Sequence, residues 1–186
     1  KHREYENQTG PGRRGVGCAL FWYNTAVWPI SLESCSCRMV LNQDGSIQLQ
    51  TGETEIGQGC DTAFAQMAAD AVGIPVSDVH VVTAQDTDVT PFGTGAYASR
   101  QTYVGGFAIA QTGALLKERI LKYACELTRQ MPALLDIVDG RIIRRTDGRV
   151  LMTLGELATE ALYSLSHSEH LTAESTYQIK NNAYSF

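Results

Sequence analysis

The chain has 186 residues, of which 44% are hydrophobic and 19% charged, so it can bury an ordinary core and is too apolar to be disordered. Its 20 acidic residues outnumber its 15 lysines and arginines, giving a formal net charge of -5. This balance argues against a nucleic-acid-binding protein, which needs clustered basic residues, and no run approaches the roughly 18 apolar residues of a membrane-spanning helix. We therefore expect a soluble globular domain that binds neither nucleic acid nor membrane.

The N-terminal part of the sequence predicts an arm followed by a strand. Residues 1–14 are polar and contain Gly and Pro, which indicates a linker or mobile arm before a domain that spans residues 15–186. From Gly15 to Tyr23 the apolar residues alternate as they do in a strand. The alternating positions are Val16, Cys18, Leu20 and Trp22.

Two further runs predict a β-hairpin. Residues 35–42 and 46–52 alternate between apolar and polar types, and Asp44-Gly45 lies in the short connection between them. Asp-Gly between alternating runs is typical of a tight hairpin turn. Each run should place its apolar residues on one face. These residues are Cys35, Cys37, Met39 and Leu41 in the first run, and Ile47, Leu49 and Thr51 in the second.

Two helices are predicted in the middle of the chain. Apolar residues recur at helical spacing between Ala63 and Val72, and Gly73 is a typical helix stop. A short strand near residues 79–82 and a loop over residues 85–96 follow. A longer helical pattern then runs from about Ser99 to Thr128. Its inward face is expected to carry Val104, Phe107, Ala110, Ala114 and Leu121.

The last third of the chain predicts short strands and one capped helix. Strands are expected near Ile137, near Ile142 and over residues 176–179. A helix from Thr153 to Ser164 should begin with a capping box, because a glutamate follows Thr153 by three residues. Since strands and helices alternate but hairpins intervene, the fold class is α+β, with mixed or antiparallel sheets packed by two or three helices.

The two ends of the sequence and its cysteines and histidines predict the context in which the chain occurs. It begins at Lys1 without an initiator methionine or a signal peptide and ends at Phe186 just after a strand-like stretch, so we expect a segment of a longer polypeptide. Five cysteines, an odd number without a Cys-x-x-Cys pair, indicate a reducing, cytoplasmic compartment. The histidines at positions 2, 80, 167 and 170 form no zinc-binding pattern, and no direct metal ligand is predicted.

Two glycine loops that each precede a helix form the candidate binding site. They are Gly57-Gln58-Gly59 and the stretch from Gly93 to Arg100. A helix N-terminus leaves backbone amides unpaired and carries partial positive charge, which suits a phosphate or another anion. Gln58 and Gln101 offer amide groups, Ser99 a hydroxyl and Arg100 a guanidinium fork. Two such loops could grip one polar, phosphate-bearing cofactor from two sides.

Other known motifs fit less well. The stretch Gly93–Ala98 formally matches the dinucleotide pattern G-x-G-x-x-[GA]. However, the preceding predicted strand ends about ten residues earlier, and no acidic residue follows at a second strand about 20 positions on. The Walker A motif and the Gly-x-Ser-x-Gly motif of hydrolases are absent. The nearby carboxylates lie on extended segments where solvated carboxylates are common, so none is assigned a catalytic role. They are Glu53, Glu55, Asp86 and Asp88.

The same loops carry a resemblance to a known family. The stretch Thr-Gly-Glu-Thr-Glu-Ile-Gly-Gln-Gly over residues 51–59, followed by Thr62-Ala63, resembles the molybdenum-binding large subunit of the molybdenum hydroxylases. This family comprises the xanthine dehydrogenases, aldehyde oxidases and carbon monoxide dehydrogenases. The stretch from Asp86 to Thr102 is similar to the family's second cofactor loop, in the same order and at the same separation. The likeness covers about residues 15–186, is sharp only at the loops, and is closest to bacterial xanthine dehydrogenases.

The resemblance implies one lobe of a molybdopterin-binding domain. Gln58, between Gly57 and Gly59, would lie next to the molybdenum oxo groups. The segment that wraps the pterin and its phosphate would be Tyr97, Ala98, Ser99, Arg100 and Gln101. Enzymes of the family hydroxylate a purine, another N-heterocycle or an aldehyde with oxygen from water, and work with FAD and iron–sulfur subunits or domains.

The departures from the family pattern limit what this chain is expected to do. The base glutamate of the family lies in a Gly-Glu-Pro-type segment that does not occur up to Phe186. We therefore expect no catalytic residue in this chain, an inactive isolated piece, and a partner in the remaining part of the molybdenum subunit. Cofactor binding by the piece alone stays open. The alternatives are a non-enzymatic α+β interaction or assembly module and, third, a nucleotide-binding domain that uses Gly93 and Gly95.

Overall fold

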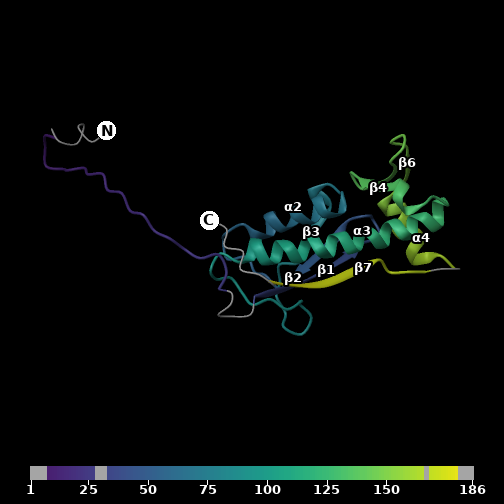
Figure 1. The fold of residues 1–186 in the computed structure, drawn as a ribbon, viewed down its shortest axis with the longest axis horizontal. Helices are drawn as coiled ribbons and strands as arrows, with labels where there is room; N and C mark the ends of the chain where they lie inside the picture. Colours follow the sequence, from purple (N-terminus) through teal and green to yellow (C-terminus); the bar gives the residue numbers. More distant parts are fainter. Residues whose placement is uncertain (1–7, 28–32, 166–167, 180–186) are drawn as a thin grey trace.

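The computed structural model describes residues 8–27, 33–165 and 168–179 and shows an elongated body from which the N-terminal arm extends (Figure 1). The larger sheet has the strand order β3-β2-β1-β7 and the smaller one the order β4-β5-β6. Helices α2 (Cys60–Val72) and α3 (Gly106–Thr128) pack together on one face of the larger sheet, and α4 (Leu154–Tyr163) packs beside the smaller sheet. Mixed and antiparallel sheets packed by helices confirm the predicted α+β fold.

The predicted hairpin forms the centre of the larger sheet. Strand β1 (Ser34–Leu41) pairs antiparallel with β2 (Ile47–Thr51), and Leu41 lies opposite Ile47. Gly45 in the turn has a φ of 90°, and the carboxylate of Asp44 accepts hydrogen bonds from the amide and the hydroxyl of Ser46. All seven residues predicted for the inward faces are buried. The alternating pattern was therefore sufficient to identify the core side of this hairpin.

Strands β3 and β7 form the two edges of this sheet. Strand β3 (Val79–Val81) pairs parallel with β2 after the α2 crossover. Strand β7 (Thr172–Gln178) pairs antiparallel with β1 and begins earlier than the predicted residues 176–179. Its sequence is mostly polar and Ala173 is its one buried residue, so hydrophobic alternation gives little sign of where this edge strand starts.

Glycines allow the helices to pack closely. Gly73 ends α2 in the left-handed conformation, with a φ of 97°, and its amide donates to the carbonyl of Ala69. A Cβ atom at Gly73 would lie 2.2 Å from the carbonyl oxygen of Ile137, so the backbone needs glycine there for two reasons. On α3, a Cβ at Gly113 would lie 2.6 Å from the Cβ of Ala71. The predicted stop at Gly73 is confirmed.

The predicted inward face of α3 is only partly right. Val104, just before α3, is buried and Leu121 is packed against the core, but Phe107 is 50% exposed and Ala110 and Ala114 are exposed as well. The helix carries apolar residues on two sides, and the side that faces the sheet also holds polar Thr112. The Thr112 hydroxyl is satisfied by the carbonyl of Ala108 and the hydroxyl of Ser175. Spacing alone could not decide between the two sides.

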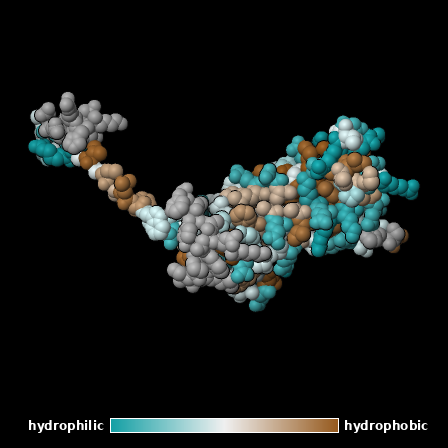
Figure 2. Space-filling view, in the orientation of Figure 1, coloured by the Kyte–Doolittle hydropathy of each residue, from teal (hydrophilic) through white to brown (hydrophobic). Residues whose placement is uncertain are grey.

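The other apolar side of α3 lies in an open groove beside α2. Six of the residues that line this groove are apolar or aromatic: Met67, Ala71, Tyr103, Phe107, Ala110 and Ala114. The other three are Asp70, Thr102 and Gly106. Figure 2 shows a band of apolar side chains along these two helices.

The smaller sheet is a meander. Strands β4 (Leu135–Val138) and β5 (Arg141–Arg144) form a hairpin, and β6 (Val150–Thr153) leads into α4. The predicted capping box is present, because the amide of Glu156 donates to Thr153 Oγ1 at 3.2 Å and the amide of Thr153 donates to Glu156 Oε2 at 2.8 Å.

The prediction of a strand from Gly15 to Tyr23 is wrong, because among the described residues this segment pairs with no other strand. This segment is extended but has no strand partner, and Leu20 and Phe21 are 96% and 90% exposed. Alternation identifies residues that suit a strand, but a strand forms only beside another strand that accepts its backbone hydrogen bonds. The predicted boundary between a linker at residues 1–14 and a domain from residue 15 stays a prediction. No helix among the described residues is long and apolar enough to cross a membrane.

Candidate functional site

The two glycine loops meet through a pair of glutamines. Gln58 Nε2 donates a hydrogen bond to Gln101 Oε1 and another to the carbonyl of Thr54 at 3.1 Å. Gln101 Nε2 donates to the same carbonyl at 3.0 Å. The loop before α2 and the loop before α3 are therefore tied together at one point, although they are far apart in the sequence.

The first loop is held by a carboxylate of its own. Gly57 and Gly59 have φ values of 101° and 83°, a left-handed conformation that favours glycine. Glu55 Oε1 accepts hydrogen bonds from the amides of Gly57 and Gly59, and Oε2 accepts one from the amide of Asp61. These hydrogen bonds lower the pKa of Glu55 from 4.5 to about 2. Because the Glu55 carboxylate already accepts the amide of Asp61 in the first turn of α2, its negative charge disfavours a second anion at this helix end.

The second loop keeps its helix end open. Ala98 and Ser99 have φ values of 47° and 51°, which is unusual for residues other than glycine and is frequent at binding sites. The helical turn η2 (Gln101–Gly105) follows at once and continues into α3. Its first amides have no acceptor within the helix, and among the described residues none is found for the amides of Gln101 and Thr102. The anion-binding feature expected at both loops is therefore present at the second one.

Arg100 takes a role that differs from the predicted one. Its side chain is fully buried, with Nε 2.5 Å from Glu33 Oε2 and Nη1 2.8 Å from Glu53 Oε1. Nη1 also donates to the carbonyl of Gly95, and Nη2 donates to that of Ser34, both at 2.8 Å. The guanidinium thus points into the protein between two carboxylates. The prediction that it serves as a fork for a cofactor anion is not supported by this position.

The buried cluster around Arg100 connects the second loop to the sheet. Burial raises the pKa of Glu53, and the neighbouring Arg100 charge opposes this shift. Burial, assisted by the Glu53 charge, also raises the pKa of the Cys35 thiol to about 12. Glu33 Oε1 accepts a hydrogen bond from the amide of Val27, so the end of the N-terminal arm joins the same cluster. The cluster fixes where the loop sits, and its charges are not available to a ligand.

A cavity of about 490 Å³ opens at the junction of the two loops. It is lined by Tyr23, Ile56, Gln58 and residues 96–102, and none of these described residues is acidic. Gln58 and Ser99 are exposed, and the Tyr97 ring lies 5.6 Å from the Arg100 guanidinium carbon. All eight predicted site residues therefore lie in or beside one cavity, with Gly57 and Gly59 flanking the lining residue Gln58.

Sequence reasoning missed two contributors to this site. Tyr23 reaches the cavity from the N-terminal arm, and nothing in the local pattern places that arm beside the loops. Glu55 was left without a role. Its position two residues before Gly57 and four before Gly59 is a spacing from which a carboxylate can cap the loop amides, and this spacing was the available signal.

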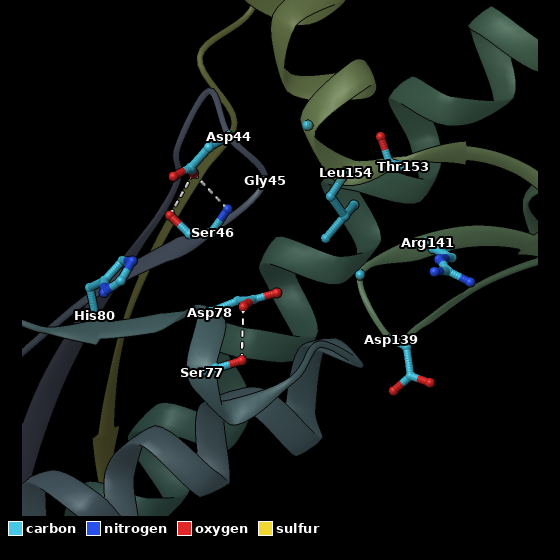
Figure 3. A pocket seen from close by; sticks show the side chains of 12 residues that line it. Asp44, Gly45, Ser46, Ser77, Asp78, His80, Asp139, Arg141, Thr153 and Leu154 are labelled. Carbon is cyan, nitrogen blue, oxygen red and sulfur yellow. Dashed lines mark hydrogen bonds between the residues drawn. The ribbon is translucent and has the colours of Figure 1, made fainter.

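A second hollow, of about 440 Å³, lies at the other end of the larger sheet (Figure 3). Asp44 and Ser46 come from the β1–β2 turn, Asp78 from the turn before β3, and Asp139 from the β4–β5 turn. The hydroxyl of Ser77 bonds to Asp78, as that of Ser46 bonds to Asp44. Three aspartates against one arginine and one histidine make this hollow a poor place for an anionic ligand.

The possible metal ligands do not form a convincing centre. Within the described residues, Glu55, Cys60 and Asp61 are the one group of three whose ligand atoms lie close together. Glu55 is already held by backbone amides, and burial raises the pKa of the Cys60 thiol to about 12, which disfavours the thiolate that a metal needs. Cys35 and Cys37 are buried in the core as apolar fillers, and His80 is exposed. His2 and His167 lie outside the described residues.

Comparisons with known proteins converge on one family. The sequence profile of the molybdopterin cofactor-binding domain matches residues 1–186. The putative xanthine dehydrogenase molybdenum-binding subunit XdhA of Escherichia coli (strain K12) is 44% identical over 187 residues, covering 100% of this chain and 25% of that protein. The chain thus spans about a quarter of the length of the curated relatives it matches.

Solved structures show the same likeness. Quinoline 2-oxidoreductase from Pseudomonas putida 86 aligns with a TM-score of 0.70 and 27% identity, covering 80% of this chain and 19% of that chain. Reconstituted CO dehydrogenase from Oligotropha carboxidovorans aligns with a TM-score of 0.70 and 27% identity, covering 79% of this chain and 18% of that chain. The similarity therefore extends over most of the fold.

Proposed function

The chain belongs to the molybdopterin cofactor-binding domain family, and on this basis we propose that it forms one wall of the molybdenum-cofactor site in a larger molybdenum hydroxylase. The observation that carries this proposal is the Gln58–Gln101 contact. It joins the two loops beside a cavity that also contains an open helix N-terminus. This combination of amide groups and positive backbone potential suits a polar, anionic cofactor.

The described residues fit the phosphate end of a molybdopterin. The backbone amides near Gln101 and Thr102 belong to the start of a helix, and the left-handed residues Ala98 and Ser99 turn the preceding backbone around the cavity. The lining contains no carboxylate to repel an anion, in contrast to the hollow around Asp44. The site is therefore compatible with the cofactor on charge and on hydrogen-bonding groups.

Each residue has a distinct part in this proposal. Residues 97–101 would hold the pterin and its phosphate, mainly through the backbone and the Ser99 hydroxyl. Gln58, between Gly57 and Gly59, would place its amide beside the metal. Arg100 would act through its buried contacts by fixing the loop, since its guanidinium faces Glu33 and Glu53. The bound cofactor would supply the redox chemistry of hydroxylation, while these residues orient it and donate hydrogen bonds to it.

The activity and partners of the whole protein are also part of the proposal. The parent would be an oxidoreductase that hydroxylates a small purine, another N-heterocycle or an aldehyde in the cytoplasm, together with FAD and iron–sulfur subunits or domains. No catalytic base is assigned within this chain, so the isolated piece should be inactive. The remaining part of the molybdenum subunit would complete the site.

The proposal is tested by analysing the full-length parent protein for its cofactor. We expect molybdenum and an oxidised, fluorescent pterin in a one-to-one ratio after expression with ample molybdate. Absence of both under these conditions would overturn the proposal and favour a non-enzymatic module. Calorimetric titration with dinucleotides tests the nucleotide-binding alternative. That alternative predicts a heat of binding that is lost when Gly93 and Gly95 are replaced, and no heat would exclude it.

A further inference from the structure

The N-terminal segment Gly15–Tyr23, which we call the apolar arm, is exposed along its whole length. Leu20, Phe21, Trp22 and Tyr23 are 96%, 90%, 71% and 65% exposed, and Val16 is 68% exposed. The arm extends away from the body in Figure 1 and includes brown, apolar residues in Figure 2. Globular proteins rarely leave contiguous apolar surface of this kind in water, so the arm is a candidate contact surface.

Both faces of the apolar arm suit burial. In an extended segment Val16, Cys18, Leu20 and Trp22 share one face, and Ala19, Phe21 and Tyr23 share the other. The nine residues contain no charge and no proline, so nothing in them opposes pairing with another strand. Strands that are apolar on both faces are typical of positions inside a sheet that is covered on both sides.

The arm leaves the body directly beside the cofactor cavity. The amide of Ala26 donates to the carbonyl of Ala98 at 2.7 Å, and Ala26 is buried. The amide of Val27 donates to Glu33 in the buried cluster. Tyr23 lines the cavity itself. A partner that covers the Tyr23 end of the arm therefore lies next to the cavity, on the side of Ala98.

We propose that the apolar arm is a β-strand that pairs with a sheet edge in the remainder of the same polypeptide and thereby closes the cofactor cavity on the Tyr23 side. This inference rests on the proposed function, since it takes the chain as part of a longer subunit. The curated relatives are about four times as long as the aligned region, because the chain covers 25% of their length.

A covalently connected partner fits the small size of the arm. Nine residues fall well short of the roughly 20–30 residues a side that a stable intermolecular interface uses. A partner on the same chain needs no such area, because its effective concentration is high. A second copy of the chain or a separate subunit would have to add further contacts to hold the arm.

The proposal is tested by hydrogen–deuterium exchange on the full-length parent protein. Amides of residues 16–22 should exchange at least a hundredfold more slowly than their intrinsic rates, while those of the polar residues 8–14 stay fast. Exchange of residues 16–22 at intrinsic rates would overturn the proposal. If the arm exchanges freely in a protein that contains molybdenum and pterin, the pairing fails and the proposed function stands. If the arm is protected in a protein that lacks both, the pairing stands and the proposed function fails.

A photo-crosslinker at Phe21 identifies the partner without changing the backbone. The expected product has the mass of one polypeptide and joins residue 21 to a peptide outside residues 1–186. A crosslinked dimer, a product with another subunit, or an internal link to residues 33–179 would each contradict the proposal.

A backbone substitution gives a second measurement. Ala19→Pro removes an amide and should raise exchange in residues 16–22, whereas Gly12→Pro, in the polar segment, should leave it unchanged. Equal exchange in the two variants would argue against a paired strand.

Discussion

Gln58 and Gln101 are joined side chain to side chain, and both donate to the carbonyl of Thr54. The contact links the loop that precedes α2 with the helical turn that precedes α3. Both glutamines also line the cofactor cavity, so each loop contributes one side-chain amide group to it. The two residues therefore form a single structural unit, and replacing either one should disturb the other.

We expect Gln58→Ala and Gln101→Ala each to weaken cofactor retention by the full-length protein up to about tenfold, since a neutral hydrogen bond contributes about 0.5–1.5 kcal/mol. Because the residues act as a pair, the double variant should lose little more than either single one. Molybdenum and pterin content after gel filtration measures this. Gln111→Ala, on the exposed side of α3, is the matched control and should retain the cofactor. Strictly additive losses would show that the pair does not act as a unit.

The cluster around Arg100 leads to a prediction about stability. Arg100→Ala leaves Glu33 and Glu53 buried without their cation, which should lower the free energy of unfolding by about 3–5 kcal/mol. Arg38→Ala removes an exposed ion pair with Glu174 and should cost about 1 kcal/mol or less. Urea unfolding followed by circular dichroism compares the two. A loss at Arg100 as small as that at Arg38 would mean that the cluster does not support the loop.

Local patterns were enough to predict the parts of the fold that depend on neighbouring residues. Asp44-Gly45 indicated the hairpin, alternation identified its buried face, and Gly73 marked the end of α2 because only glycine suits the left-handed conformation there. The candidate site followed from two features that are also local, glycine before a helix and a polar loop. That the two loops act on one cofactor followed from the shared helix-terminus chemistry, and the family resemblance agreed with it.

The parts that could not be predicted depend on contacts between distant residues. The direction of the Arg100 side chain is decided by Glu33 and Glu53, and nothing in the sequence around Arg100 indicates those partners. The buried side of α3 is decided by the sheet and α2, because the helix is apolar on two sides. The segment from Gly15 to Tyr23 has strand-like alternation but no partner strand among the described residues.

A close backbone crossing holds the second loop against the sheet. A Cβ atom at Gly52 would lie 2.3 Å from the amide nitrogen of Gly93, and the neighbouring amide of Ser36 donates to the carbonyl of Phe92 at 2.7 Å. Gly52→Ala should therefore push the loop away and lower the free energy of unfolding by about 1–3 kcal/mol. Gly12→Ala, with open space around it, should change it by less than about 0.5 kcal/mol. Thermal unfolding of both variants measures this. Equal unfolding midpoints would mean that the close approach of Gly52 and Gly93 does not restrict the side chain at position 52.

Glu55 makes the first loop sensitive to acid. Its carboxylate accepts three backbone hydrogen bonds, so its pKa falls from 4.5 to about 2 in the folded protein. A depressed pKa means that the folded state favours the ionised form, so the stabilisation is present above pH 4.5 and is lost as the pH falls toward about 2. Glu55→Gln removes this charge while keeping the shape of the side chain. The variant should therefore be less stable than the unmodified protein at neutral pH, and the difference should shrink as the pH falls through that window.

Urea unfolding at neutral pH and at several values down to about pH 3 measures that difference directly. Glu118→Gln, on the exposed surface of α3, is the control and should show no such trend. A difference between Glu55→Gln and the unmodified protein that stays constant across the pH range would mean that the ionised carboxylate does not hold the loop. In that case the left-handed glycines at positions 57 and 59 would have to fix the position of Gln58 without it.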